Sequence, residues 1–481
     1  MSKRYHESRE DLTPPRMPPS LRSALYRFHW TLRSRAARFG FLQALALAEE
    51  SQRWPRERLE ALRDRKLREL VAHFHANSPY YRVLMERHRV TPSEIRGIAD
   101  IGKLPILTKA MIREHAPALR ARGFPDSQVE FGITGGTTGN PMRVTRDLPG
   151  TVWQRACYWR GFGWGGLRLG DTWFQLFGGA LGLSSRRTKD RLKNWFSGKH
   201  FLPAFELQGH NTEQYIEAIR ASGARHLVGY ASSCFILARH LESTGRTLPL
   251  EAVFPTAELI PDSWFDTMRR AFGAKVLPYY GCGEVQSLGY TCPDSETPVY
   301  HTCDEHAVIE VEGRDGRTSL EGEGAFLLTD LDNAAMPLIR YRNGDAGAIA
   351  GPGCACGRTL GRILRLDGRV NDVLLTADGE MISGAIGAHA FKMVAHVHQF
   401  QIIQREPGHA RIRIVTMPDY DAPAEEDKLR RIFKSHLGEN ARVEIEYPPE
   451  IAATVAGKAR LVINEYLEGA GAASAPAGKP G

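Results

Sequence analysis

The chain has 481 residues, 42% of them hydrophobic, and a mean hydropathy of -0.34, so it is long enough for one large core and a second domain. Its seven cysteines are odd in number and unevenly spread, which excludes a scaffold held by disulfides. The formal charge of +8 comes from 63 basic and 55 acidic residues, and much of the excess lies near the start. Residues 1–16 lack the apolar core of a signal peptide, and the longest apolar run, Phe39–Ala48, is too short to span a bilayer, so we expect a cytoplasmic protein.

The first hundred residues predict a lead-in followed by helices. Residues 1–20 are charged and proline-rich, and we expect them to be flexible. From Leu21 to about Ile98, apolar residues recur at helical spacing, with a break at Ser78–Tyr81. The first helical segment carries an arginine stripe interleaved with aromatic residues, namely Arg22, Arg27, Arg33, Arg35 and Arg38 with Tyr26, Phe28 and Trp30. Such a stripe is able to meet nucleic acid or an anionic membrane face, but more often it is the solvated side of an amphipathic helix, which is our expectation.

Residues 134–147 are the stretch around which we expect the function to be organised. The alternation of Val129, Phe131 and Ile133 predicts a strand that ends in this loop. Three glycines and three threonines at positions 134–139 leave backbone amides accessible and add short donors, which suits a loop that grips a triphosphate tail. No Gly-Lys-Ser/Thr closes the loop, so it is not a P-loop NTPase signature. An ordinary turn is the alternative.

Beyond this loop, strand-sized apolar runs alternate with helical stretches, which is typical of parallel strands joined by crossover helices. The predicted strands are residues 172–176, 226–229, 252–254 and 275–279, and the predicted helices are residues 150–161, 232–243 and 262–272. Residues 307–349 change to short strands and turns, so we expect a more antiparallel element beside the first sheet. The sequence therefore predicts the α/β class. The Gly/Ala/Ser/Pro-rich tail at residues 469–481 is expected to be disordered.

Four further stretches carry residues suited to nucleotide chemistry. Tyr279–Glu284 places an aromatic ring and a carboxylate around a tight turn. Met336–Asp345 ends a strand with an aspartate that suits the hydroxyls of a ribose diol. Gly368–Asp372 precedes a predicted strand, and Thr454–Lys458 offers one lysine on a glycine turn.

In this order, the five motifs resemble those of the adenylate-forming enzymes, and most closely their phenylacetate-CoA ligase-like branch, which includes capsular-polysaccharide-type members. The resemblance covers roughly Leu104–Asn464. Two phrases, Phe177–Gly182 and Ala335–Arg342, resemble that branch rather than the wider superfamily. Each motif is weak alone, but the ordered set is specific.

The resemblance implies a role for each motif in binding ATP. The β- and γ-phosphates would lie on Thr134, Gly135, Gly136, Thr137, Thr138 and Gly139. Tyr280 would stack on adenine, and Asp345 would bind the ribose hydroxyls with Arg369 nearby. Activating a carboxylate brings two anions together, and cations fixed at the developing charge lower that barrier. Magnesium positioned by Glu284 and the mobile Lys458, bridging the carboxylate and the α-phosphate, would supply them, so Lys458, Glu284 and Thr134 are the expected catalytic residues.

By the same resemblance, a large ATP- and acid-binding domain at residues 21–369 is followed by a small mobile α+β domain at residues 370–468. The reaction implied is activation of a carboxylic acid as an acyl adenylate, with release of pyrophosphate and then acyl transfer to coenzyme A. Transfer to an amine or to a carrier-protein thiol, as in natural-product or polysaccharide assembly, is the alternative. The sequence does not name the acid.

The chain departs from the family pattern at two positions. A serine or threonine usually precedes the Glu284 position and contacts the α-phosphate, whereas this chain has Gly283. The hinge position is commonly aspartate or lysine and is Asn371 here. A nucleotide-binding scaffold without turnover is therefore a rival hypothesis, although Lys458, Glu284 and Asp345 are retained. A nucleic-acid-binding protein built on the basic first segment is a second rival, but no zinc-finger spacing or RNA-binding aromatic signature supports it.

The cysteines suggest a structural metal. Cys354 and Cys356 form a Cys-x-Cys turn that is able to present two thiolates to one ion, and Cys292 with His301 would complete a closed Cys₃His zinc site. Members of the resembling branch carry a similar set, including the spacing from His301 to His306. Scattered reduced thiols are the alternative.

Overall fold

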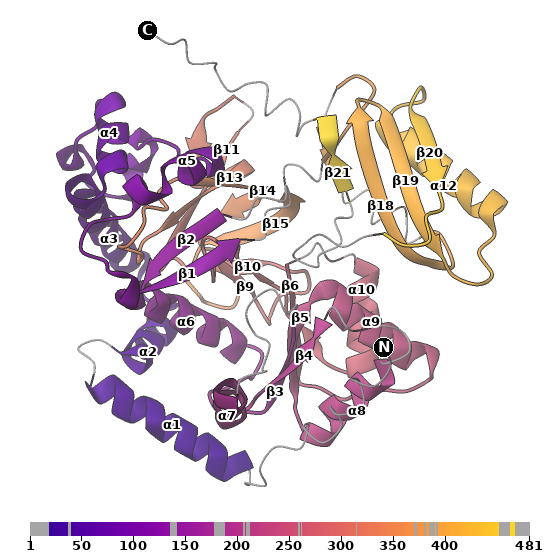
Figure 1. Ribbon diagram of the computed structural model, residues 1–481, viewed down its shortest axis with the longest axis horizontal. Helices are drawn as coiled ribbons and strands as arrows, with labels where there is room; N and C mark the ends of the chain where they lie inside the picture. The colour runs from indigo at the N-terminus through magenta and orange to yellow at the C-terminus, as the bar shows by residue number, and fades with distance from the viewer. Residues whose placement is uncertain are drawn as a thin grey trace. The chain divides into compact units, whose positions relative to one another are not determined.

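The computed structural model describes residues 19–36, 40–134, 142–177, 188–204, 207, 212–257, 260, 262–313, 315–369, 373–379, 381–383, 390, 393–451 and 462–466. The chain divides into two compact units. Figure 1 labels the helices and strands of both. The first comprises Met1–Glu49, Arg155–Thr256 and Thr267–Pro278, and the second comprises Glu50–Gln154, Ala257–Asp266 and Tyr279–Gly481.

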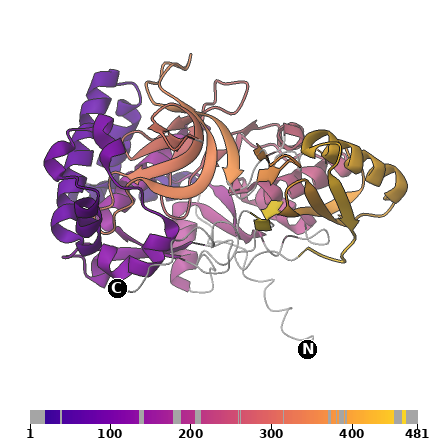
Figure 2. The same ribbon diagram turned by 90° about the horizontal axis from the view of Figure 1, so that it is seen from above.

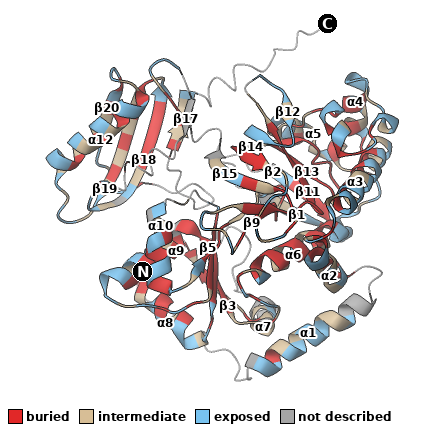
Figure 3. Cartoon of the chain, turned by 180° about the vertical axis from the view of Figure 1, so that it is seen from behind, coloured by how far each residue is buried: buried red, intermediate tan, exposed pale blue. Residues whose placement is uncertain are grey.

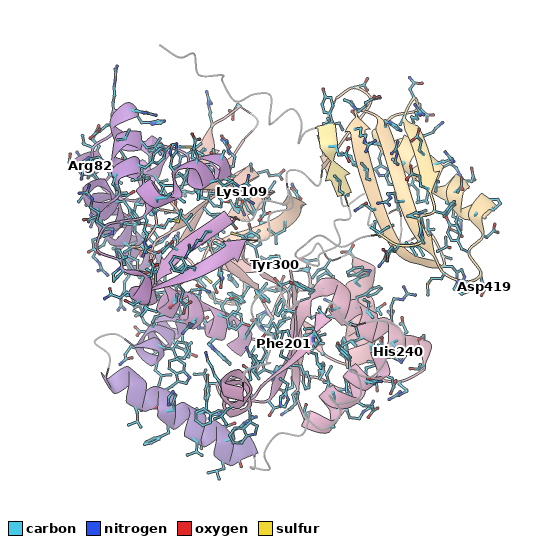
Figure 4. The ribbon with its side chains drawn as sticks, viewed as in Figure 1. Arg82, Lys109, Phe201, His240, Tyr300 and Asp419 are labelled. Carbon is cyan, nitrogen blue, oxygen red and sulfur yellow. The ribbon has the colours of Figure 1, made fainter. Side chains whose placement is uncertain are left out.

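The first unit contains a parallel sheet of β3 (Trp173–Phe177), β4 (Lys199–Pro203), β5 (His226–Tyr230), β6 (Ala252–Thr256) and β7 (Lys275–Val276), in the order β4-β3-β5-β6-β7. Every residue of β5 and β6 is buried, as expected for parallel strands covered on both faces. The helices that alternate with these strands are α7 (Thr188–Ser197), α8 (Thr212–Ser222), α9 (Ala231–Ser243) and α10 (Asp262–Phe272). His240 of α9, labelled in Figure 4, lies 3.1 Å from Glu213 of α8 and joins the two helices.

The second unit is built on an antiparallel sheet in the order β12-β11-β13-β14-β15-β10-β9-β8. Its strands are β8 (Tyr279–Tyr280), β9 (Gly289–Thr291), β10 (Tyr300–Thr302), β11 (Ala307–Glu312), β12 (Thr318–Ser319), β13 (Gly322–Asp330), β14 (Tyr341–Ala350) and β15 (Arg362–Arg369). A separate antiparallel hairpin pairs β1 (Val129–Thr134) with β2 (Met142–Asp147).

Helices near the start of the second unit share one apolar core with this sheet (Figure 2). The helices in and around the amino-terminal third are α1 (Pro19–Ala36), α2 (Phe41–Ser51), α3 (Arg56–Asn77), α4 (Pro79–Arg87), α5 (Lys109–Leu119) and α6 (Leu148–Gly163). Ser78 ends α3 and caps α4 by accepting a hydrogen bond from the Tyr81 amide. Thr108 caps α5 in the same way through Met111. The change of helix at Ser78 agrees with the break predicted at Ser78–Tyr81.

The carboxyl-terminal residues of the second unit have a core of their own. A sheet in the order β20-β19-β18-β21 combines β18 (Val397–Glu406), β19 (His409–Thr416), β20 (Arg442–Glu446) and β21 (Val462–Asn464). A two-stranded ladder pairs β16 (Val373–Leu375) with β17 (Met381–Ser383). Helix α12 (Ala422–Leu437) begins at the cap Asp421 and buries Leu429, Phe433 and Leu437 in this core. Figure 3 shows the buried centres of β18 and β19.

The parallel and antiparallel parts confirm the predicted α/β class, but the stretch 275–279 is not one strand. The Leu277 amide still donates to the Val253 carbonyl at 2.8 Å. Pro278 follows and has no amide hydrogen, so the parallel ladder cannot continue through it. The chain resumes at Tyr279 as β8 in the antiparallel sheet.

A buried ion pair fixes the entry into β14. The Arg340 guanidinium donates to the Glu310 carboxylate of β11, to the Leu104 carbonyl at 2.6 Å and to the Gly102 carbonyl at 3.0 Å. The side chains of Arg340 and Glu310 are only 4% and 2% exposed. Burial raises the pKa of Glu310, and the adjacent guanidinium opposes that rise. Arg340 therefore joins the segment before α5 to two strands of the sheet.

We predict that Arg340→Met lowers the free energy of unfolding by about 3–5 kcal/mol, because it leaves a carboxylate buried without its partner. The matched control is Arg342→Met, which removes a guanidinium that pairs with Glu312 two positions further along each strand and is 40% exposed. We expect the control to cost about 0–1 kcal/mol. Urea unfolding of the two variants measures the difference, and equal losses would contradict the role assigned to Arg340.

Candidate nucleotide and metal sites

A bulge in β14 places Asp345 beside Tyr280. Between Arg342 and Ala346, β14 has three residues where the paired strand β13 has one, Phe326, so β14 carries two extra residues. Gly344 within the bulge has a φ of +90°, which favours glycine. Bulges re-aim side chains next to functional sites. We expected β14 to end at Asp345. The strand instead continues to Ala350, because pairing with β13 resumes after the bulge, at Ala346.

The bulge creates a polar cluster around one aspartate. The Tyr280 hydroxyl donates to Asp345 Oδ2 at 2.8 Å, and the Asn343 amide nitrogen donates to the same oxygen at 2.6 Å. Burial, and then the negative charge of Asp345, raises the pKa of Tyr280 well above its usual value, so the hydroxyl keeps its proton. The Tyr280 ring is 9% exposed and lies edge-on to Phe326 with centroids 6.0 Å apart. The structure thus brings together Tyr280 and Asp345, and Asn343 is a partner that our sequence reasoning missed.

Glu284 lies in the turn after β8 and is 6% exposed. The Tyr341 hydroxyl, from the first residue of β14, donates to its Oε1 at 2.9 Å. Burial, followed by the charge of Glu284, raises the pKa of Tyr341 and keeps this donor protonated. A carboxylate is the kind of hard oxygen ligand that magnesium takes, commonly one or two per site together with substrate phosphates. Glu284 therefore fits that ion by donor type.

Arg146 is a charged residue at this site that our sequence reasoning missed. From β2 it donates to the carbonyls of Gly283 and Glu284, the second at 3.0 Å. Burial lowers its pKa, and surrounding acidic groups including Asp330 and Glu284 oppose the shift. A Cβ at Gly132 on the paired strand would lie 2.6 Å from Arg146 Nη1, so a side chain there would displace the guanidinium. Arg146 lies two residues after the buried Val144 and so on the same face of β2, and a charge at such a position was the available signal.

The other expected nucleotide residues are described only in part. Thr134 ends β1, where it pairs with Met142, and residues 135–141, with Gly135, Gly136, Thr137, Thr138 and Gly139, lie outside the described residues. Arg369 pairs in register with Asp345 across β15 and β14, which places the two backbones side by side. Asn371 and Lys458 also lie outside the described residues.

The four predicted metal ligands converge. The ligand atoms of Cys292, His301, Cys354 and Cys356 all lie within 4.8 Å of one another. Cys292 Sγ is 3.8 Å from Cys354 Sγ, and His301 Nε2 is 3.2 Å from Cys356 Sγ. Two sulfurs on a tetrahedral zinc, each bonded at about 2.3 Å, are about 3.8 Å apart, so this spacing fits the ion. Burial would raise the pKa of Cys356, but hydrogen bonds from Arg358 outweigh it and lower the pKa, which favours the thiolate that a metal requires.

His306 is not part of this cluster, despite its spacing from His301. Its Nδ1 lies 2.8 Å from Asp332 Oδ2, and its Nε2 lies 3.1 Å from the Gln286 carbonyl. The other carboxylate oxygen of Asp332, Oδ1, accepts a hydrogen bond from Lys66 Nζ at 2.5 Å. Glu284 is part of the same turn as Gln286. His306 therefore links this turn to the segment after β13.

Comparisons with known proteins show what this chain is similar to. The CapK C-terminal domain matches residues 374–465. Phenylacetate-coenzyme A ligase of Thermus thermophilus is 26% identical over 450 residues, covering 86% of this chain and 98% of the relative. The protein of that name from Aromatoleum evansii is 23% identical, covering 86% and 96%. Among solved structures, 2-hydroxyisobutyryl-CoA ligase in the postadenylation state with 2-HIB-AMP superposes with a TM-score of 0.66 and 19% identity, over 86% of this chain and 92% of that one.

The structural likeness shows that the fold is that of 2-hydroxyisobutyryl-CoA ligase. In sequence, the chain is similar over most of its length to phenylacetate-coenzyme A ligases, and its carboxyl-terminal residues match the CapK C-terminal domain.

Proposed function

We propose that this protein is an AMP-forming ligase that activates a carboxylic acid as an acyl adenylate, releases pyrophosphate and transfers the acyl group to coenzyme A. Two hydrogen bonds to β14 carry the proposal, from Tyr280 of β8 to Asp345 and from Tyr341 to Glu284 in the turn after β8. They lie in a chain related over most of its length to phenylacetate-coenzyme A ligases. We place the reaction in the cytoplasm, where ATP is available and thiols stay reduced. An amine or a carrier-protein thiol is the alternative acceptor.

In this proposal the polar groups of the nucleotide site bind and orient ATP. Asp345 accepts hydrogen bonds from the ribose hydroxyls, Tyr280 lies against the adenine, and Arg369 is close to both. Residues 134–139 hold the β- and γ-phosphates. A magnesium ion on Glu284, when bound, neutralises charge on the phosphates. Arg146 fixes the carbonyls of Gly283 and Glu284, and so holds the turn in place where the usual hydroxyl side chain is missing.

The domain division remains part of the proposal. Residues 21–369 would form the large domain and residues 370–468 the small one, with the hinge near Asn371. Rotation of the small domain would bring Lys458 to the α-phosphate for adenylation and withdraw it for acyl transfer. A lysine suits this task, because its flexible stem delivers a point charge to a site that must later open.

We predict that Glu284→Ala and Asp345→Ala each reduce acid-dependent exchange of pyrophosphate into ATP by about two to three decades, since each removes a group that holds the reacting nucleotide. Asp367→Ala is the matched control, because its carboxylate pairs with Arg365 at 2.6 Å and is 25% exposed. The exchange assay is run with a set of aryl, alkyl and hydroxy acids, because the sequence does not name the acid. Undiminished exchange in both variants would refute the nucleotide site.

We further predict one zinc ion per chain on Cys292, His301, Cys354 and Cys356. A closed site of this kind stabilises the fold, so Cys354→Ser should lose the metal and unfold at a lower urea concentration without a change in acid preference. Cys303→Ser is the control, because Cys303 is a buried free thiol outside the cluster. Elemental analysis of protein purified without chelator measures the zinc content. Protein that contains no zinc would contradict the predicted metal site.

Finally, we predict that Lys458→Ala separates the two half-reactions. Losing a charge placed at the transition state should cost about 3–4 kcal/mol, or two to three decades in the rate of adenylation. When a synthetic acyl adenylate is supplied, transfer to coenzyme A should stay near the parent rate. Equal loss in both half-reactions, or loss in neither, would show that this lysine has another role.

A further inference from the structure

Helix α1 is held to the first unit by one of its faces. Tyr26 lies edge-on to Phe196 with ring centroids 5.4 Å apart, and Trp30 lies 4.8 Å from Phe41. On the same side, Arg22 is buried and donates to the Gly170 carbonyl at 3.0 Å and to Thr172 Oγ1 at 2.8 Å. These contacts fix which face of the helix points inward.

The close approach of α1 to residue 170 reinforces that orientation. Ser23 donates to the Gly170 carbonyl at 2.5 Å. A Cβ at Gly170, whose φ is +88°, would lie 2.8 Å from the Ser23 Cα. A small residue on the helix and a glycine on the loop are therefore both required. We expected the whole arginine stripe to be solvated, but Arg22 is buried against the rest of the first unit.

The opposite face of α1 is also apolar, and it is exposed. Leu21, Leu25, Phe28 and Leu32 are 50%, 40%, 58% and 49% exposed, and Figure 3 shows the helix mostly in the colours of exposed and intermediate residues. Their spacing of four, three and four residues keeps them in one stripe. A helix on the surface of a globular protein normally turns such a stripe toward the core. Contiguous exposed apolar groups of this kind mark interaction sites.

The positive charge of the segment that contains α1 indicates what kind of partner covers the apolar stripe. Between Thr13 and Ala48 the sequence has six arginines and no aspartate or glutamate. Two copies of α1 packed against each other would bring these like charges together, which opposes a pairing of copies. An anionic lipid surface instead offers hydrocarbon for the apolar stripe and phosphates for the arginines. None of the helices in the described ranges has the length and apolarity needed to cross a membrane.

We propose that α1 is a docking helix that lies in the interface of an anionic membrane. Leu21, Leu25, Phe28 and Leu32 enter the boundary between headgroups and acyl chains. The lipid phosphates are met by the arginines of the segment other than Arg22 and Arg27, because these two bond to residues 169–172 of the first unit. The inward contacts of Arg22, Ser23, Tyr26 and Trp30 hold the helix to the enzyme, so that the whole chain is brought to the surface. This inference is independent of the reaction proposed above.

The test is co-sedimentation of the full chain with vesicles made of equal parts phosphatidylcholine and phosphatidylglycerol. We expect binding that weakens as sodium chloride is raised, and little binding to phosphatidylcholine alone. The double substitution Leu25→Ser with Phe28→Ser should weaken binding by more than about tenfold. The matched control is Leu320→Ser with Leu364→Ser, two side chains outside α1 that are 38% and 43% exposed.

Each variant is first compared with the parent by circular dichroism and urea unfolding, so that misfolding is recognised. Three results would overturn the proposal: no binding to the anionic vesicles, equal binding by both double variants, or a parent dimer that the α1 substitutions dissociate, which would make a second copy the occupant of the stripe. Binding of RNA or DNA in place of vesicles, lost at high salt, would also overturn it in favour of a nucleic-acid surface.

Discussion

The hydrogen bond from Tyr341 to Glu284 joins the two parts of the chain on which the proposed nucleotide site depends. Glu284 lies in a turn without regular structure, whereas Tyr341 opens the long strand β14 at the centre of the antiparallel sheet. A buried carboxylate is costly without such a donor. The contact therefore sets where the carboxylate lies, and the core beneath Tyr341, which is 0% exposed, sets where the donor lies. Arg146 and His306 hold the same turn from its backbone.

Sequence reasoning found most of the elements, because their signals are local. The break at Ser78–Tyr81 and the alternation of strands and helices are patterns within a few residues, and they correspond to the observed elements. The convergence of Cys292 and His301 with Cys354 and Cys356 was a hypothesis from residue type and resemblance, and the geometry agrees with it. Whether an ion binds there is a separate question, answered by the metal content of the protein.

What the sequence did not reveal depends on contacts between distant segments. Arg146 was missed because its partners, the carbonyls of Gly283 and Glu284, lie in a turn far along the chain. Asn343 is only two residues from Asp345, but the bulge that brings their side chains together depends on the pairing of β14 with β13. The single strand expected at 275–279 was wrong because Pro278 ends one ladder while Tyr279 enters another, and periodicity alone cannot assign a strand to its sheet. Likewise, the helical period of α1 predicts an amphipathic helix but does not say that Arg22 points inward.

The bulge in β14 also bears on how such a site can arise. Side chains alternate between the two faces of a strand, so adding a single residue would turn every later side chain to the other face. The bulge adds two, since three residues of β14 lie opposite one of β13, and the alternation on either side of it is kept. Asn343, Gly344 and Asp345 therefore stand out of the ladder with β13, while the residues before and after them keep the faces that an unbroken strand would give them.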